Sequence, residues 1–129
     1  MIKKARILLV DDDPDFVAST KTVLESNSYE VIVANNGNEG IIKATSEKPD
    51  LIILDVIMPV KDGFTAAEQF KKDPQLSKIP IIMLTSFSSK HGETSIPVSA
   101  GYALEAEDYV EKPIEPQALI KVVEKYIRK

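Results

Sequence analysis

Cysteine is absent from this 129-residue sequence, and histidine occurs once, at position 91. The chain therefore has no disulfide, no thiolate zinc site and no cysteine nucleophile, and a lone histidine cannot form a cluster of imidazole ligands. The first apolar segment covers only about five residues, which is too short for a signal peptide or a membrane span. We therefore expect a cytoplasmic protein that binds no membrane.

An excess of positive charge is also missing. The chain has 16 lysine and arginine residues against 20 aspartate and glutamate residues, a formal net charge of -4 and a sequence pI near 5.0. Binding to nucleic-acid phosphates needs lysine and arginine clustered on one face, so we expect this domain to bind no nucleic acid. The length suits one domain, and we expect residues 1–129 to form it.

Short apolar segments alternate with longer amphipathic ones along the chain. Such alternation is typical of a parallel sheet whose strands are joined by right-handed crossovers, with helices on both faces. Asp13 and Pro14 predict the start of the first helix, with Asp13 as the N-cap rather than a metal ligand. The predicted strands are 6–10, 29–34, 51–54, 80–84 and 108–110, and the clearer helices are 14–26, a short one around 41–44 that Pro49 closes, 64–70 and one that starts at 115–116.

Polar residues follow four of the predicted strands. In an open parallel sheet, ligands bind beyond the carboxyl ends of the strands, so these residues converge on one cleft. Three carboxylates meeting there repel one another, and a hard cation such as Mg²⁺ relieves that repulsion. A lysine and a hydroxyl beside them suit an aspartate that receives a phosphoryl group. The residues are Asp11, Asp12, Asp55, Thr85 and Lys112.

These residues and the sequence motifs around them resemble the receiver domain of two-component response regulators, and the resemblance covers nearly the whole chain. The resemblance implies a flavodoxin-like, doubly wound α/β fold whose five parallel strands have the order 2-1-3-4-5. It also implies a stand-alone receiver with no output domain in this chain. The matching motifs are Ile7-Leu-Leu-Val-Asp-Asp-Asp-Pro14, Asp55-Val-Ile-Met-Pro59 with Asp62-Gly63, Leu84-Thr85-Ser86 and Asp108-Tyr-Val-Glu-Lys-Pro113.

The resemblance also implies a role for each site residue. Asp55 is the expected phosphoacceptor. Mg²⁺, with Mn²⁺ as an expected substitute, would be held by Asp12, Asp55 and the backbone carbonyl of Ile57, and by Asp11 mainly through water. Lys112 would contact the phosphoryl oxygens, and Thr85 would move toward the phosphoryl group on activation. Tyr109 would be the aromatic residue that changes its side-chain rotamer at the same time.

Two departures from the family pattern stand out. Thr85 and Lys112 are 27 positions apart, which is longer than the family spacing. Within the intervening segment, residues 86–97 are rich in serine and include a glycine and a proline. We expect the fourth helix to be short, displaced or replaced by a loop. Ile57 and Phe87 are apolar at positions that flank the path of the attacking water in relatives. Slow autodephosphorylation is the expected consequence.

The favoured function is a phosphorylation-dependent switch. It would take phosphate from a histidine kinase or phosphotransfer protein and signal to an unknown downstream protein, as a monomer or weak dimer. It would not be an enzyme, apart from catalysing its own phosphorylation and autodephosphorylation. An alternative is a receiver-fold interaction module that works without phosphorylation. An aspartate-based phosphatase is disfavoured, because Ile57 occupies the place of its second aspartate.

Overall fold

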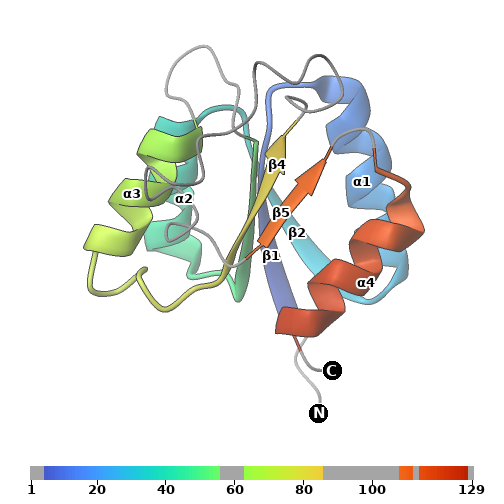
Figure 1. The fold of residues 1–129 in the computed structure, drawn as a ribbon. Helices are drawn as coiled ribbons and strands as arrows, with labels where there is room; N and C mark the ends of the chain where they lie inside the picture. Colours follow the sequence, from blue (N-terminus) through green and yellow to red (C-terminus); the bar gives the residue numbers. More distant parts are fainter. Residues whose placement is uncertain (1–4, 56–62, 86–107, 112–113, 128–129) are drawn as a thin grey trace.

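A computed structural model describes residues 5–55, 63–85, 108–111 and 114–127. Its five strands form one parallel sheet in the order β2-β1-β3-β4-β5, as predicted. Described helices cover both faces, with α2 and α3 on one and α1 and α4 on the other (Figure 1). The elements are β1 (Ala5–Val10), α1 (Pro14–Ser26), β2 (Tyr29–Ala34), α2 (Gly37–Glu47), β3 (Leu51–Asp55), α3 (Gly63–Lys72), β4 (Ile81–Thr85), β5 (Asp108–Glu111) and α4 (Pro116–Tyr126).

The expected change in the fourth crossover lies outside the described residues, because it falls on the segment 86–107. The helix labelled α4 is the last of the predicted helices, the one that starts at Glu115 and Pro116. Among the described residues, no helix is both long enough and apolar enough to cross a membrane.

The side chains of the central strands pack into two cores, one on each face of the sheet. Successive side chains of a strand point to opposite faces of the sheet. Leu8 and Val10 of β1 therefore belong to the core beneath α2 and α3, whereas Ile7 and Leu9 belong to the core beneath α1 and α4. All four side chains are fully buried. This explains why the predicted strand was a continuous apolar run.

The start of α1 follows the prediction from Asp13 and Pro14. The Asp13 side chain accepts hydrogen bonds from the backbone N–H groups of Asp15 at 3.1 Å and Phe16 at 3.3 Å. Pro14 occupies the first helical position, where a missing N–H has no consequence. Asp13 is therefore the N-cap, as predicted, and a cap of this kind stabilises a helix by about 1 kcal/mol.

Helix α2 is confirmed, with two details that the sequence did not indicate. Ile42 is 67% exposed and so lies off the buried stripe of the helix. At Gly40, a Cβ atom would lie 3.0 Å from Cγ2 of Val10, so the absent side chain allows α2 to approach the end of β1 closely. The helix ends at Glu47, and its C-cap residue Lys48 has a left-handed conformation with φ 52°, one residue before Pro49.

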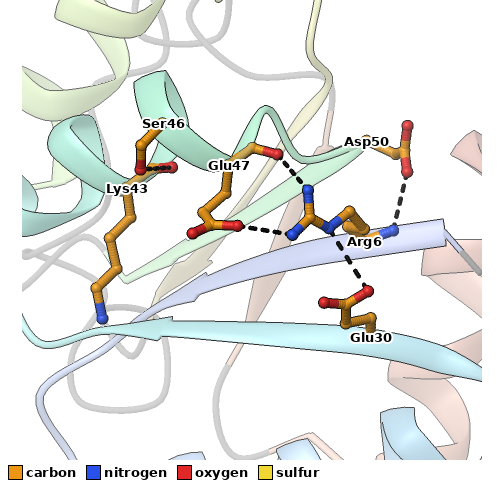
Figure 2. A network of polar contacts seen from close by, with 6 residues as sticks. All are labelled: Arg6, Glu30, Lys43, Ser46, Glu47 and Asp50. Atoms are coloured by element: carbon orange, nitrogen blue, oxygen red, sulfur yellow. Dashed lines mark hydrogen bonds and ion pairs between the residues drawn. The ribbon is translucent and has the colours of Figure 1, made fainter.

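A polar network joins α2 to the edge of the sheet at which the parallel strands begin (Figure 2). The guanidinium of Arg6 donates to the backbone carbonyl and to Oε1 of Glu47, both at 2.6 Å. Its Nε lies 3.5 Å from Oε1 of Glu30 in β2. The backbone N–H of Arg6 donates to Oδ2 of Asp50 at 2.8 Å. The network thus ties the end of α2 and the start of β3 to the two neighbouring strands.

Candidate metal centre

Three aspartates meet at the carboxyl edge of the sheet. Asp11 and Asp12 follow β1, and Asp55 is the last residue of the adjacent strand β3. One carboxylate oxygen of each lies within 4.8 Å of the others. Asp11 is fully buried, Asp55 is 5% exposed, and Asp12 is exposed to solvent. The predicted convergence is therefore confirmed for these three residues.

Backbone hydrogen bonds hold Asp11 in place. Its N–H donates to the carbonyl of Ala34 at 3.1 Å, which extends the pairing of β1 with β2 by one residue. Oδ1 of Asp11 accepts from the backbone N–H of Asp13 at 2.9 Å. The carboxylate plane is thus set by the same turn that begins α1. Sequence reasoning assigned Asp13 only to the cap and missed this second contribution through its backbone.

The donor set suits a hard divalent cation. Mg²⁺ prefers oxygen ligands, uses one or two carboxylates and keeps several waters. Two buried carboxylates provide fixed oxygens, and the exposed Asp12 leaves one side open to water. The cation would also offset the electrostatic repulsion among the three negative charges.

A cavity of about 390 Å³ opens beside the acidic cluster. Asp11 and Asp12 line one part of it, and the first turns of α1 line another. Asn35 also lines it, and sequence reasoning did not assign that residue to the site. The available signal was its position directly after β2, because ligands in this fold gather beyond the strand ends. The α1 residues are Pro14, Val17 and Ala18.

The backbone of Thr85 also reaches this edge. Asp55 is the register partner of Leu84 in the neighbouring strand, so Thr85 lies one residue farther toward the carboxyl end. In the next strand, Tyr109 is the partner of Met83. The side chains of Thr85 and Tyr109 lie outside the described part of the chain. So do Ile57, Phe87 and Lys112, together with their expected roles.

An open, doubly wound parallel sheet with an acidic cluster beyond its strand ends defines a class of α/β domains that bind ligands at that edge. Within this class, the chain belongs to the response regulator receiver domain family, whose model matches residues 7–124. It is thus a receiver domain of two-component signalling, and the general function of such domains is that of a phosphorylation-dependent switch.

Three similar proteins illustrate the relationship. Protein PilH of Pseudomonas aeruginosa is 38% identical over 119 residues, which are 92% of this chain and 94% of PilH. The structure of chemotaxis protein CheY4 of Vibrio cholerae gives a TM-score of 0.85 at 29% identity, covering 97% of this chain and 100% of that one. The receiver domain of sensor histidine kinase PA1611 of Pseudomonas aeruginosa gives 0.83 at 26% identity, covering 98% and 100%.

The PA1611 structure has a magnesium ion coordinated in its active site cleft. Some curated relatives are longer proteins. The chain spans 49% of the transcriptional regulatory protein PhoP of Bacillus subtilis, with 36% identity over 124 residues.

Proposed function

We propose that this chain accepts a phosphoryl group on a carboxylate oxygen of Asp55, with Mg²⁺ held by Asp11, Asp12 and Asp55. The observation that carries the proposal is the approach of these three carboxylates to within 4.8 Å at the carboxyl edge of a receiver-domain sheet. Mn²⁺ would substitute, because it also prefers carboxylate and water ligands.

The reaction is a transfer between two nucleophiles. A carboxylate oxygen of Asp55 forms a bond to phosphorus as the bond from phosphorus to the donor's imidazole nitrogen breaks, and that nitrogen then takes a proton. A cation held by Asp11, Asp12 and Asp55 would supply positive charge that offsets the negative charge on the phosphoryl oxygens. Asp11 would keep its place during transfer, because its N–H donates to the Ala34 carbonyl and its Oδ1 accepts from the Asp13 N–H.

Four further roles remain part of the proposal. Lys112 would contact the phosphoryl oxygens, and the backbone carbonyl of Ile57 would complete the ligand set. Thr85 would approach the phosphoryl group after transfer, with Tyr109 changing in concert. The role proposed for Thr85 is supported by its backbone position, which is one residue beyond Leu84, the register partner of Asp55.

The proposed phosphodonor is a histidine kinase or a phosphotransfer protein, and a downstream protein would recognise the altered domain. We propose that the chain works in the cytoplasm as a monomer or weak dimer, and that it catalyses only its own phosphorylation and autodephosphorylation. Moving a two-state switch from mostly off to mostly on needs about 5.5 kcal/mol of differential stabilisation. New charge-assisted contacts to the phosphoryl oxygens would supply part of it.

Intact-mass spectrometry tests this proposal. The protein is incubated with acetyl phosphate and MgCl₂, and a gain of about 80 Da is expected. The gain should disappear in Asp55→Asn and in excess EDTA. The matched control is Asp15→Asn, which removes a carboxylate from the first turn of α1 outside the acidic cluster and should still be phosphorylated. No gain in the wild-type protein would favour an interaction module that works without phosphorylation.

A further inference from the structure

Strand β2 forms one edge of the sheet, and within the described residues it pairs only with β1. Its sequence, Tyr-Glu-Val-Ile-Val-Ala, contains no proline or glycine, and its central residues Val31, Ile32 and Val33 are only half-buried. An edge strand of this composition is a template for pairing with another chain unless the protein blocks it.

One hydrogen bond shows which backbone groups of β2 point away from the sheet. The Ala34 carbonyl accepts from Asp11 N–H, so it points toward β1. Backbone groups of successive residues in a strand point to opposite sides, so the carbonyl of Val33 and the N–H of Asn35 point away from the sheet. A sixth strand added here would pair with these two groups.

Two side chains of α2 already occupy both groups. Nζ of Lys43 donates to the Val33 carbonyl at 2.6 Å, and Oε1 of Glu39 accepts from Asn35 N–H at 2.6 Å. The same two side chains form an ion pair, with Nζ of Lys43 3.5 Å from Oε2 of Glu39. Figure 2 shows the Lys43 side chain extending from α2 toward β2.

The pair has the bonding pattern of one strand residue. In a parallel ladder, a residue of an added strand donates its N–H to one carbonyl of the edge and accepts from the N–H two residues farther along. Lys43 supplies that donor and Glu39 supplies that acceptor. We propose that the Glu39–Lys43 pair closes the edge of β2 to strand addition, and that it excludes β2 of a second copy of this chain.

A second copy fits the edge because the interface would be self-complementary. Two β2 strands related by a two-fold axis perpendicular to the sheet would pair edge to edge and antiparallel, and this ladder would also use the outward-pointing Val33 carbonyl and Asn35 N–H. Their apolar residues alternate in the same way, since Val31 packs against the core beneath α1 and Ile32 packs against the core beneath α2. The joined sheet would continue both cores. This inference does not depend on phosphorylation of Asp55.

Sedimentation velocity over a wide protein concentration range tests the role of Lys43. In Lys43→Met the stem remains but the ammonium donor is lost. The expected result is self-association at least about tenfold tighter than in the wild type, because pairing satisfies the exposed carbonyl. The matched control is Lys21→Met, which loses an ion pair with Glu25 on α1 and no contact with the edge. If Lys43→Met sediments like the wild type and the control, the proposal is overturned.

Amide hydrogen exchange locates the interface. The N–H groups of Val31 and Val33 should become protected as Lys43→Met associates, and a dimer without that protection would contradict the proposal. In Glu39→Ala, exchange at Asn35 should become about tenfold faster even in the monomer, as one net hydrogen bond is lost. Glu39→Gln keeps an acceptor and should show less of this effect. Unchanged exchange at Asn35 in a folded Glu39→Ala protein would also overturn the proposal.

Discussion

The backbone N–H of Asp13 donates a 2.9 Å hydrogen bond to Oδ1 of Asp11. The side chain of the same residue caps α1 by accepting from the backbone N–H groups of Asp15 and Phe16. One residue therefore both starts a helix and orients a buried carboxylate of the acidic cluster. The geometry of the site is consequently linked to the first turn of α1.

Substitution of Asp11 by asparagine tests the balance of charge in the acidic cluster. The amide oxygen can still accept from Asp13, whereas one of three negative charges is lost. Without divalent cations, the free energy of unfolding should rise by about 1 kcal/mol, because repulsion among the carboxylates falls. The stabilisation that Mg²⁺ adds should shrink, with an affinity at least about tenfold weaker. Urea unfolding in EDTA and in MgCl₂ measures both effects.

The control for that experiment is Asp15→Asn, which alters charge near α1 but outside the cluster. It should leave the stabilisation by Mg²⁺ unchanged. Equal stabilisation of the wild type and Asp11→Asn by Mg²⁺ would count against the assigned metal centre.

Loss of the Arg6 guanidinium should destabilise the fold without affecting phosphorylation. Arg6 is three-quarters buried and donates to the carbonyl and carboxylate of Glu47. Arg6→Met should lower the free energy of unfolding by about 1 to 3 kcal/mol, because charge-assisted bonds to a partly buried group are lost. Lys72→Met, which removes an exposed pair with Glu68, should cost less than about 0.5 kcal/mol. Equal costs for the two variants in urea unfolding would refute the role of the network.

The decrease in the free energy of unfolding at acidic pH should depend on Glu39. The hydrogen bond from Asn35 N–H, with a smaller contribution from Lys43, holds the pKa of Glu39 below its usual value of 4.5. A carboxyl group with a lowered pKa contributes stability above its unfolded-state pKa and loses it as the pH falls through the folded-state pKa. The wild type should therefore lose more stability than Glu39→Gln as the pH falls from neutrality to below 4.5. The free energy of unfolding of both proteins is measured by denaturant titration at several pH values. An equal loss in the wild type and in Glu39→Gln would contradict this prediction.

Most of the fold could be predicted from the sequence because local signals agreed with the tertiary structure. Asp13 and Pro14 marked the start of α1, and fully buried strands were visible as apolar runs. Strand ends such as Asp11 and Asp55 could be placed together, since parallel strands bring their carboxyl ends to one edge.

Contacts that depend on the exact approach of α2 could not be predicted. Ile42 is apolar but exposed, because the helix turns its small residues Gly40 and Ala44 toward the sheet. The bonds of Arg6 to Glu47 and of Lys43 to Val33 join residues 41 and 10 positions apart. No local pattern encodes such pairs, since they form only once the helix has docked.

Phosphoryl lifetime should depend on position 87, two residues after Thr85. In relatives, the residue at this position flanks the path of the attacking water, and an apolar side chain such as that of Phe87 would not orient this water. Phe87→Glu or Phe87→Asn should accelerate autodephosphorylation by about tenfold, because a polar group can position the water. Release of inorganic phosphate after removal of the donor gives the rate. An unchanged lifetime in both variants would refute this explanation.

The identity of the phosphorylated residue is the central claim. Borohydride reduces an acyl phosphate to an alcohol, so an aspartyl phosphate becomes homoserine at its own position. After phosphorylation with acetyl phosphate and MgCl₂, reduction and peptide mass spectrometry, homoserine is predicted at position 55 and at none of positions 11, 12, 13 or 15. Homoserine at one of those other aspartates, or its absence from a protein that has gained a phosphoryl group, would contradict the account.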